Sequence, residues 1–81
     1  MFGYLKNGWA MIKRKYHTLA VREAGRWAPQ FGDYDRVTVE GKRDGYRDKG
    51  TKARDLRIIT TGDAQADIDA AVAVLQRQES A

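Results

Sequence analysis

The segment that organises the chain reads Arg26-Trp27-Ala28-Pro29-Gln30-Phe31-Gly32-Asp33-Tyr34-Asp35-Arg36. It contains the only proline, one of the two tryptophans, and a glycine followed by two aspartates. Trp27, Pro29 and Phe31 alternate with other residues, which predicts a strand that carries these three side chains on one face. Because proline cannot donate to a β-ladder, we expect this strand to lie at an edge of its sheet.

The preceding residues predict the strand that pairs with this segment. Within residues 13–24, His17, Leu19 and Val21 face one way and their even-numbered neighbours face the other, which is typical of a half-buried strand. His17 therefore lies on an apolar face, without a nucleophile or an orienting group nearby in the sequence. We interpret it as a packed histidine rather than a catalytic one.

The turn between the two strands determines which side chains share a face. A two-residue loop at Ala24-Gly25 would place Trp27 opposite Arg22. A three-residue loop with Gly25 in the left-handed region would place Trp27 opposite Val21 instead. The second register gathers the apolar side chains of both strands on one face, so we predict the three-residue turn.

Two structures compete for the middle of the chain. One is a helix over about residues 35–49. The other is a third strand at 36–40, favoured by its β-branched residues and followed by a hairpin at Arg43-Asp44-Gly45. We predict the helix, because Gly41 and Gly45 are four residues apart and would let its backbone approach the sheet closely.

Asp33 and Asp35 immediately precede this predicted helix. Their carboxylates are suited to accept hydrogen bonds from its first N–H groups. As a pair they also resemble ligands for Mg²⁺ or groups for acid–base chemistry, but no further pattern of acids and glycine follows, as it would in a calcium loop. We therefore predict helix capping.

The last third of the chain predicts one strand and one helix. Asp55 to Thr61 alternates, with Leu56 and Ile58 on one face. Asp63 precedes an apolar stripe and is the expected N-cap of a helix. The stripe has the spacing of a helix that packs on a sheet and consists of Ala64, Ile68, Ala71, Val72 and Leu75.

Residues 1–12 also have helical spacing and are followed by the basic run Lys13-Arg14-Lys15. The apolar face consists of Phe2, Leu5, Trp9 and Ile12. This pattern is typical of an amphipathic anchor for a membrane surface or a partner groove. However, Gly3 and Gly8 each weaken an autonomous helix by about 1 kcal/mol. We therefore expect residues 1–10 to pack on the domain itself or on a second copy. In the second case the segment would form a homodimer contact.

Together these elements predict a small α+β domain of order α-β-β-α-β-α. A three-stranded, mainly antiparallel sheet is expected to be covered on one face by helices. We expect a single domain over residues 1–81, with residues 1–12 as a helical extension and residues 13–78 as the α+β core. The predicted core residues are Leu19, Val21, Trp27, Phe31, Val39, Leu56, Ile58, Ile68, Val72 and Leu75.

Length and composition limit the class of protein. The 81 residues include no cysteine, so no disulfide supplements a small core. No apolar run approaches the roughly 20 residues of a membrane span, and the N-terminus lacks a signal-peptide pattern, so we expect a cytoplasmic protein. The net charge is +4 and uneven, because residues 62–81 carry four acids and one arginine. This basic balance favours anionic partners.

The residue types exclude the common catalytic and metal centres. The absence of cysteine removes thiol chemistry, and one histidine cannot form a cluster of imidazole ligands. The glycines match no phosphate-binding fingerprint. We predict a non-enzymatic protein without a metal ion or cofactor.

Basic residues interleaved with tyrosines form the candidate binding surface. The first cluster surrounds the predicted hairpin and consists of Lys13, Arg14, Lys15, Arg22 and Arg26. The second lies on the middle helix and its loop and consists of Lys42, Arg43, Arg47, Lys49, Lys52 and Arg54. Tyr16, Tyr34 and Tyr46 are interleaved with them, and phosphate contacts combined with aromatic stacking are typical of a nucleic-acid surface. Three aspartates within the second cluster would neutralise part of its charge.

Three runs carry a resemblance to a known group of sequences. They are Val21-Arg22-Glu23-Ala24-Gly25-Arg26-Trp27-Ala28-Pro29-Gln30-Phe31-Gly32-Asp33-Tyr34-Asp35-Arg36, Tyr46-Arg47-Asp48 and Asp55-Leu56-Arg57-Ile58-Ile59. Over roughly residues 16–61 the chain resembles short reading frames of bacterial phages and prophages to which no activity is assigned. No residue role carries over from that group. The resemblance implies a phage accessory protein that binds and modulates a host protein.

Two functional hypotheses follow. The first is a small basic binding module whose partner is a host protein. The alternative is a nucleic-acid-binding module that uses the basic clusters at residues 13–26 and 42–54, and its affinity should fall steeply as salt rises. An enzyme is a third class, which no residue pattern favours.

Overall fold

The computed structural model describes residues 14–80. Its elements in chain order are β1 (Tyr16–Glu23), β2 (Arg26–Asp33), α2 (Arg36–Asp48), the short 3-10 helix η1 (Ala53–Asp55), β3 (Leu56–Thr61) and α3 (Gln65–Ser80). The α+β class and the order β-β-α-β-α are confirmed. The helix predicted for residues 1–12, and the contacts expected of residues 1–10, lie outside the described residues.

The sheet has three antiparallel strands in the order β2-β1-β3. β1 is therefore the central strand, and β2 and β3 are the two edges. Pro29 lies in β2, which confirms that the proline-containing strand is an edge strand. A proline at this place removes one N–H from the edge without removing a bond from the sheet.

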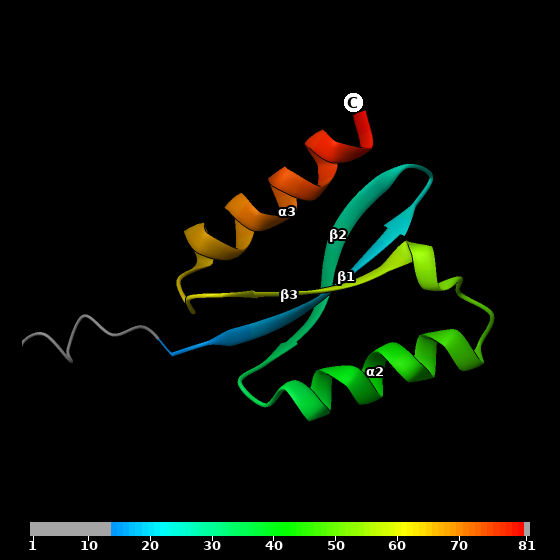
Figure 1. Cartoon of the computed structure of the whole chain (residues 1–81), viewed down its shortest axis with the longest axis horizontal. Coiled ribbons are helices and arrows are strands. Elements are labelled where there is room, and N and C mark those ends of the chain that lie inside the picture. Colours follow the sequence, from blue (N-terminus) through cyan, green and yellow to red (C-terminus); the bar gives the residue numbers. More distant parts are fainter. Residues whose placement is uncertain (1–13, 81) are drawn as a thin grey trace, which may run out of the picture.

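The two helices lie on opposite faces of the sheet, so the prediction that helices cover one face is wrong (Figure 1). On one face, Val39 of α2 packs against Leu19 of β1. On the other face, Leu75 of α3 packs against Ala20 of β1 and Trp27 of β2. Since neighbouring residues of a strand point to opposite faces, Leu19 and Ala20 can only contact two different layers.

The core is divided by the sheet into two clusters. The α2 side contains Leu19, Val21, Val39 and Leu56, with Phe31, Tyr46 and Ile58 packed against them. The α3 side contains Ala20, Trp27 and Leu75, with Ile59 and Val72 packed against them. The predicted core residues are therefore buried or half-buried, with Ile68 also buried, and Ala20 is a core residue that the prediction missed.

The hairpin turn has two residues, so the predicted three-residue turn is wrong. Ala24 and Gly25 both have positive φ, 54° and 78°, and Trp27 pairs with Arg22. Two consecutive left-handed residues form the tight turn whose twist matches that of the flanking strands. The prediction failed because it placed all apolar side chains of the hairpin on one face, whereas both faces are covered.

A β-bulge in β2 separates the two aromatic side chains of this strand. Ala20 pairs with Pro29 and Leu19 pairs with Phe31, which leaves Gln30 as an extra residue in β2. One extra residue reverses the alternation of the strand. Trp27 therefore faces α3, and Phe31 faces α2.

The helix predicted for the middle of the chain is confirmed, and Asp35 caps it. The Oδ1 atom of Asp35 accepts the N–H of Val37 at 3.0 Å. Asp33 does not cap the helix as predicted, because its Oδ1 atom accepts the N–H of Asp35 at 2.7 Å, one residue before the helix begins. Asp33 thus stabilises the turn, and Asp35 caps the helix.

The first turn of α3 differs from the prediction at Asp63. The N–H groups of Asp67 and Ile68 donate to the carbonyl of Ala64, so Ala64 occupies the cap position. The carboxylate of Asp63 instead accepts the hydroxyl of Tyr34 at 3.1 Å. Asp63 therefore connects the end of β3 to the turn that precedes α2.

Gln76 of α3 closes part of the β2 edge. Its Nε2 atom donates to the carbonyl of Gly25 at 2.9 Å, and its Oε1 atom accepts the N–H of Trp27 at 2.8 Å. A side-chain amide that donates and accepts in this way occupies the place of a neighbouring strand. Together with Pro29 and the bulge, it protects β2 against pairing with another chain.

Arg22 connects β1 to two other elements on the α3 face. Its Nε and Nη2 atoms lie 2.9 and 2.8 Å from Oδ1 of Asp55, and its Nη1 atom contacts Glu79 of α3. These hydrogen bonds, that to Asp55 first, raise the pKa of Arg22 above its ordinary value. Its guanidinium carbon lies 5.3 Å from the ring centroid of Trp27.

The contacts of Gln76 predict a specific loss of stability. Replacing Gln76 with alanine should lower the free energy of unfolding by about 1–3 kcal/mol, because two hydrogen bonds disappear and the N–H of Trp27 loses its partner. Gln78→Ala, an exposed position on the same helix, is the matched control and should change it by less than about 0.5 kcal/mol. Urea unfolding of both variants measures the difference, and equal effects would show that the contacts with the hairpin contribute nothing.

Candidate functional site

The first predicted basic cluster does not form one patch. Lys13 lies outside residues 14–80, and Arg14 and Lys15 precede β1. Arg26 begins β2 at the opposite end of the hairpin, about 26 Å away along a strand of eight residues. Arg22 is held by Asp55 and Glu79, as described above. These side chains therefore form no continuous basic patch.

The second predicted cluster is brought together on α2 and the residues that follow it. Arg43 forms an ion pair with Asp44 at 3.3 Å. Within residues 14–80, Arg47, Lys49, Lys52 and Arg54 form no ion pair. α2 presents these cations on two sides. Lys42 and Lys49 lie beside β2. Arg43 and Arg47 share with Arg36 the side of the helix that lies beside β3.

A groove lies between α2 and β2. Its volume is about 320 Å³, and it is lined by Gln30, Phe31, Gly41, Lys42, Gly45, Tyr46 and Lys49. The Nζ atom of Lys42 lies 5.1 Å from the ring centroid of Phe31. The predicted reason for the two glycines is wrong, since a Cβ atom added at either would meet no atom within 4 Å. They leave open space beside the groove instead of letting the helix approach the sheet.

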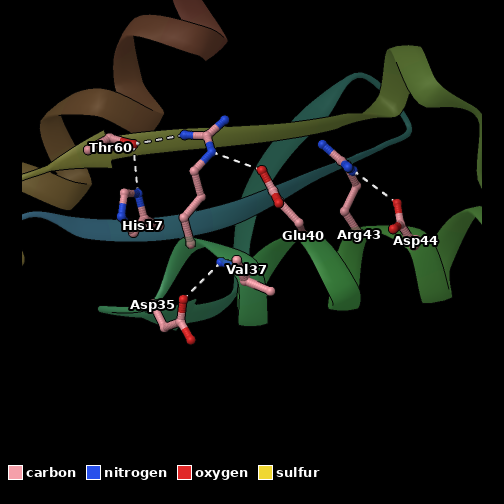
Figure 2. A network of polar contacts seen from close by, with 8 residues as sticks. His17, Asp35, Val37, Glu40, Arg43, Asp44 and Thr60 are labelled. Atoms are coloured by element: carbon pink, nitrogen blue, oxygen red, sulfur yellow. Dashed lines mark hydrogen bonds and ion pairs between the residues drawn. The ribbon is translucent and has the colours of Figure 1, made fainter.

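A chain of polar contacts runs along the other side of α2, beside β3 (Figure 2). The Nδ1 atom of His17 lies 2.8 Å from Oγ1 of Thr60 on the neighbouring strand. Arg36 donates from Nη1 to the same hydroxyl at 3.5 Å and from Nε to Glu40 at 3.0 Å. His17 is half-buried, and its contact with the hydroxyl of Thr60 links β1 to β3.

The outer edge of β3 is open. In a two-residue hairpin the residues that flank the turn, here Glu23 and Arg26, exchange backbone hydrogen bonds. The odd-numbered residues of β1 therefore direct their backbone groups to β2, and the even-numbered residues direct theirs to β3. The backbone groups of Ile58 and Thr60 consequently point away from β1. No residue from 14 to 80 pairs with them, whereas the outward N–H of Leu56 donates to Ala53.

An aromatic cluster closes the opposite end of the sheet. The rings of Tyr16 and Tyr34 meet edge to face at 5.0 Å, and the guanidinium of Arg14 lies 4.0 Å from the ring centroid of Tyr34. The hydrogen bond to Asp63 is the main reason why the pKa of Tyr34 lies above its ordinary value. The ring of Tyr16 covers Gly32, where an added Cβ would clash with the hydroxyl end of that ring. A larger residue at position 32 would therefore force the Tyr16 ring to move.

Behind this cluster lies a pocket of about 240 Å³ between α3 and the hairpin. Thr18 forms part of its wall and is only 3% exposed. The Oγ1 atom of Thr18 has no hydrogen-bond partner among the described residues. A buried hydroxyl without a partner destabilises the fold.

The part of the chain that the structure describes shows no cluster of metal ligands. No three His, Asp or Glu side chains of residues 14–80 gather as metal ligands. None of the described helices is long and apolar enough to cross a membrane. Compared with protein-family models, curated proteins and solved structures, the chain matches none.

Sequence reasoning missed two features that the structure brings forward. The open edge of β3 could not be recognised, because the order of the strands was not predicted. The pocket beside Thr18 was missed because residues 13–24 were interpreted as half-buried. A signal was available: Thr18-Leu19-Ala20-Val21 is a run of four small or apolar residues, as expected in a strand buried on both faces.

The unpaired hydroxyl of Thr18 predicts that a substitution will stabilise the protein. Thr18→Val keeps the shape of the side chain and removes the hydroxyl, so the free energy of unfolding should rise by about 1–3 kcal/mol. Thr18→Ser keeps the hydroxyl and removes a methyl group, and it should lower that free energy instead. Thermal unfolding of both variants provides the measurement. A destabilised valine variant would show that the hydroxyl has a partner in solution, such as a bound water.

Proposed function

We propose that this chain is a non-enzymatic binding module that takes an extended segment of a partner protein onto the edge of β3. The observation that carries this proposal is the contrast between the two edges of the sheet. β2 is closed by Pro29, by the bulge at Gln30 and by Gln76. The edge at Ile58 and Thr60 has none of these devices, although an unprotected edge exposes a protein to unwanted pairing.

The residues around this edge suit strand addition. An added strand takes its affinity from main-chain hydrogen bonds and its specificity from alternate side-chain contacts. The half-buried side chains of Ile58 and Ile59 lie on the two faces of β3 and would contact such a strand from both sides. Arg36, whose Nη1 atom lies 3.5 Å from Oγ1 of Thr60, would favour a segment that carries an acidic residue near this position.

The partner class follows from the resemblance to phage and prophage reading frames. A phage accessory protein without catalytic residues acts by occupying a surface of a bacterial protein. We therefore propose a host protein as the partner and inhibition or redirection of that protein as the effect.

Nucleic-acid binding is the second candidate function. The observation in its favour is the group of cations without ion pairs, Arg47, Lys49, Lys52 and Arg54, at and after the end of α2. Asp44 and Asp48 lie on the same helix and would repel a polyanion. The first predicted basic cluster is dispersed, so the second would have to bind alone.

A pull-down from bacterial lysate with variants at Thr60 tests the proposed function. Thr60→Pro removes the outward N–H without removing a bond to β1, and Thr60→Val is the matched control that removes only the hydroxyl contacts. The wild type and Thr60→Val should retain one stoichiometric protein, and Thr60→Pro should lose it while its circular dichroism spectrum stays unchanged.

Three outcomes would contradict this proposal. One is the absence of a stoichiometric partner at every salt concentration, and another is equal recovery by Thr60→Pro. The third is tight binding of labelled single- or double-stranded DNA or RNA that weakens steeply with salt, which would favour the nucleic-acid alternative.

A further inference from the structure

The groove between α2 and β2 has the composition of a binding site and lies apart from the edge of β3. Phe31 and Tyr46 provide aromatic surface, while Lys42 and Lys49 provide positive charge. No acidic residue lines it. An aromatic groove whose only charges are positive is complementary to an apolar ligand that carries negative charge.

We propose that this groove binds an extended acidic peptide segment of a protein partner. Lys42 and Lys49 are seven positions apart, about 10 Å along the helix. In the extended polyproline II conformation, residues three positions apart share one face and lie about 9 Å apart. A segment with two acidic residues three positions apart can therefore place one carboxylate at each lysine and an apolar side chain between them against Phe31.

The groove is held open at a cost to the helix. Gly41 and Gly45 lie within α2, where each glycine lowers the melting temperature by roughly 4–8 °C relative to alanine. No positive φ and no close neighbour requires glycine at either position. A methyl group at these positions would project beside the groove wall. The geometry thus ties the two glycines to access into the groove rather than to packing.

A peptide suits this groove better than a nucleic acid does. Asp44 and Asp48 are exposed on the adjoining surface of α2 and would repel a long chain of phosphates. A short acidic segment confined to the groove meets only Lys42 and Lys49. Such a segment is held by side chains of the groove and not by backbone pairing, because Pro29 and Gln76 prevent β2 from adding a strand.

Titration with two blocked peptides, followed by amide NMR shifts, tests this inference. The probe is acetylated and amidated Glu-Leu-Ala-Glu-Leu, and its neutral twin is Gln-Leu-Ala-Gln-Leu. The acidic peptide should shift the amides of Phe31, Gly41, Gly45 and Tyr46 saturably and bind about tenfold more tightly than the twin. Absence of saturation, or equal binding of the twin, would overturn the inference.

Variants separate access to the groove from its charge. Gly41→Ala and Gly45→Ala should each raise the melting temperature by roughly 4–8 °C and, combined, weaken the acidic peptide about tenfold. Lys42→Gln with Lys49→Gln should weaken it similarly, whereas Arg54→Gln, outside the groove, should leave it unchanged. The inference would be contradicted if either double variant, Gly41→Ala with Gly45→Ala or Lys42→Gln with Lys49→Gln, bound the acidic peptide with unaltered affinity.

Binding of the acidic peptide in the groove does not depend on the β3 edge. Thr60→Pro should bind the acidic peptide as the wild type does, so failure of strand addition and failure of the groove are distinguishable. A single-stranded oligonucleotide that shifts the same amides and competes with the peptide at lower concentration would reassign the groove to nucleic acid.

Discussion

The burial of β1 on both faces is the constraint on which the rest of this structure depends. Four consecutive residues of this central strand, from Thr18 to Val21, are buried. Apolar residues must therefore reach it from two layers, one carried by α2 and the other by α3. The bulge at Gln30 meets this demand within β2, because it directs Trp27 to one layer and Phe31 to the other.

The elements could be predicted from the sequence more reliably than their arrangement. Local patterns are sufficient for α2, β3 and α3, since caps, apolar spacing and β-branched residues act over a few positions. The faces of the hairpin could not be predicted, because a bulge and a tight turn each reverse the alternation and neither changes the composition. The basic clusters show the same limit: the cations of α2 are neighbours in sequence and in space, whereas Arg22 is bound by Asp55 and Glu79, which are distant in sequence.

The arrangement also determines where a partner can bind. Placing β1 at the centre makes β2 and β3 the two edges of the sheet, and only the β2 edge carries protective devices. Gln76, one of the features that protect the β2 edge, comes from α3, which packs on Trp27. Stability of the α3 layer and the choice of open edge are therefore coupled, and the α2 layer remains free to shape the groove beside Phe31.

The central claim is that the bulge sends the two aromatic side chains of β2 to opposite layers. Nuclear Overhauser effects between the aromatic rings and methyl groups measure this directly. The account predicts contacts from the indole of Trp27 to methyl groups of Leu75, and contacts from the ring of Phe31 to methyl groups of Val39. It predicts no contact from Trp27 to Val39 and none from Phe31 to Leu75. Contacts from both rings to the same helix would contradict it, because β2 would then be a regular strand without the bulge.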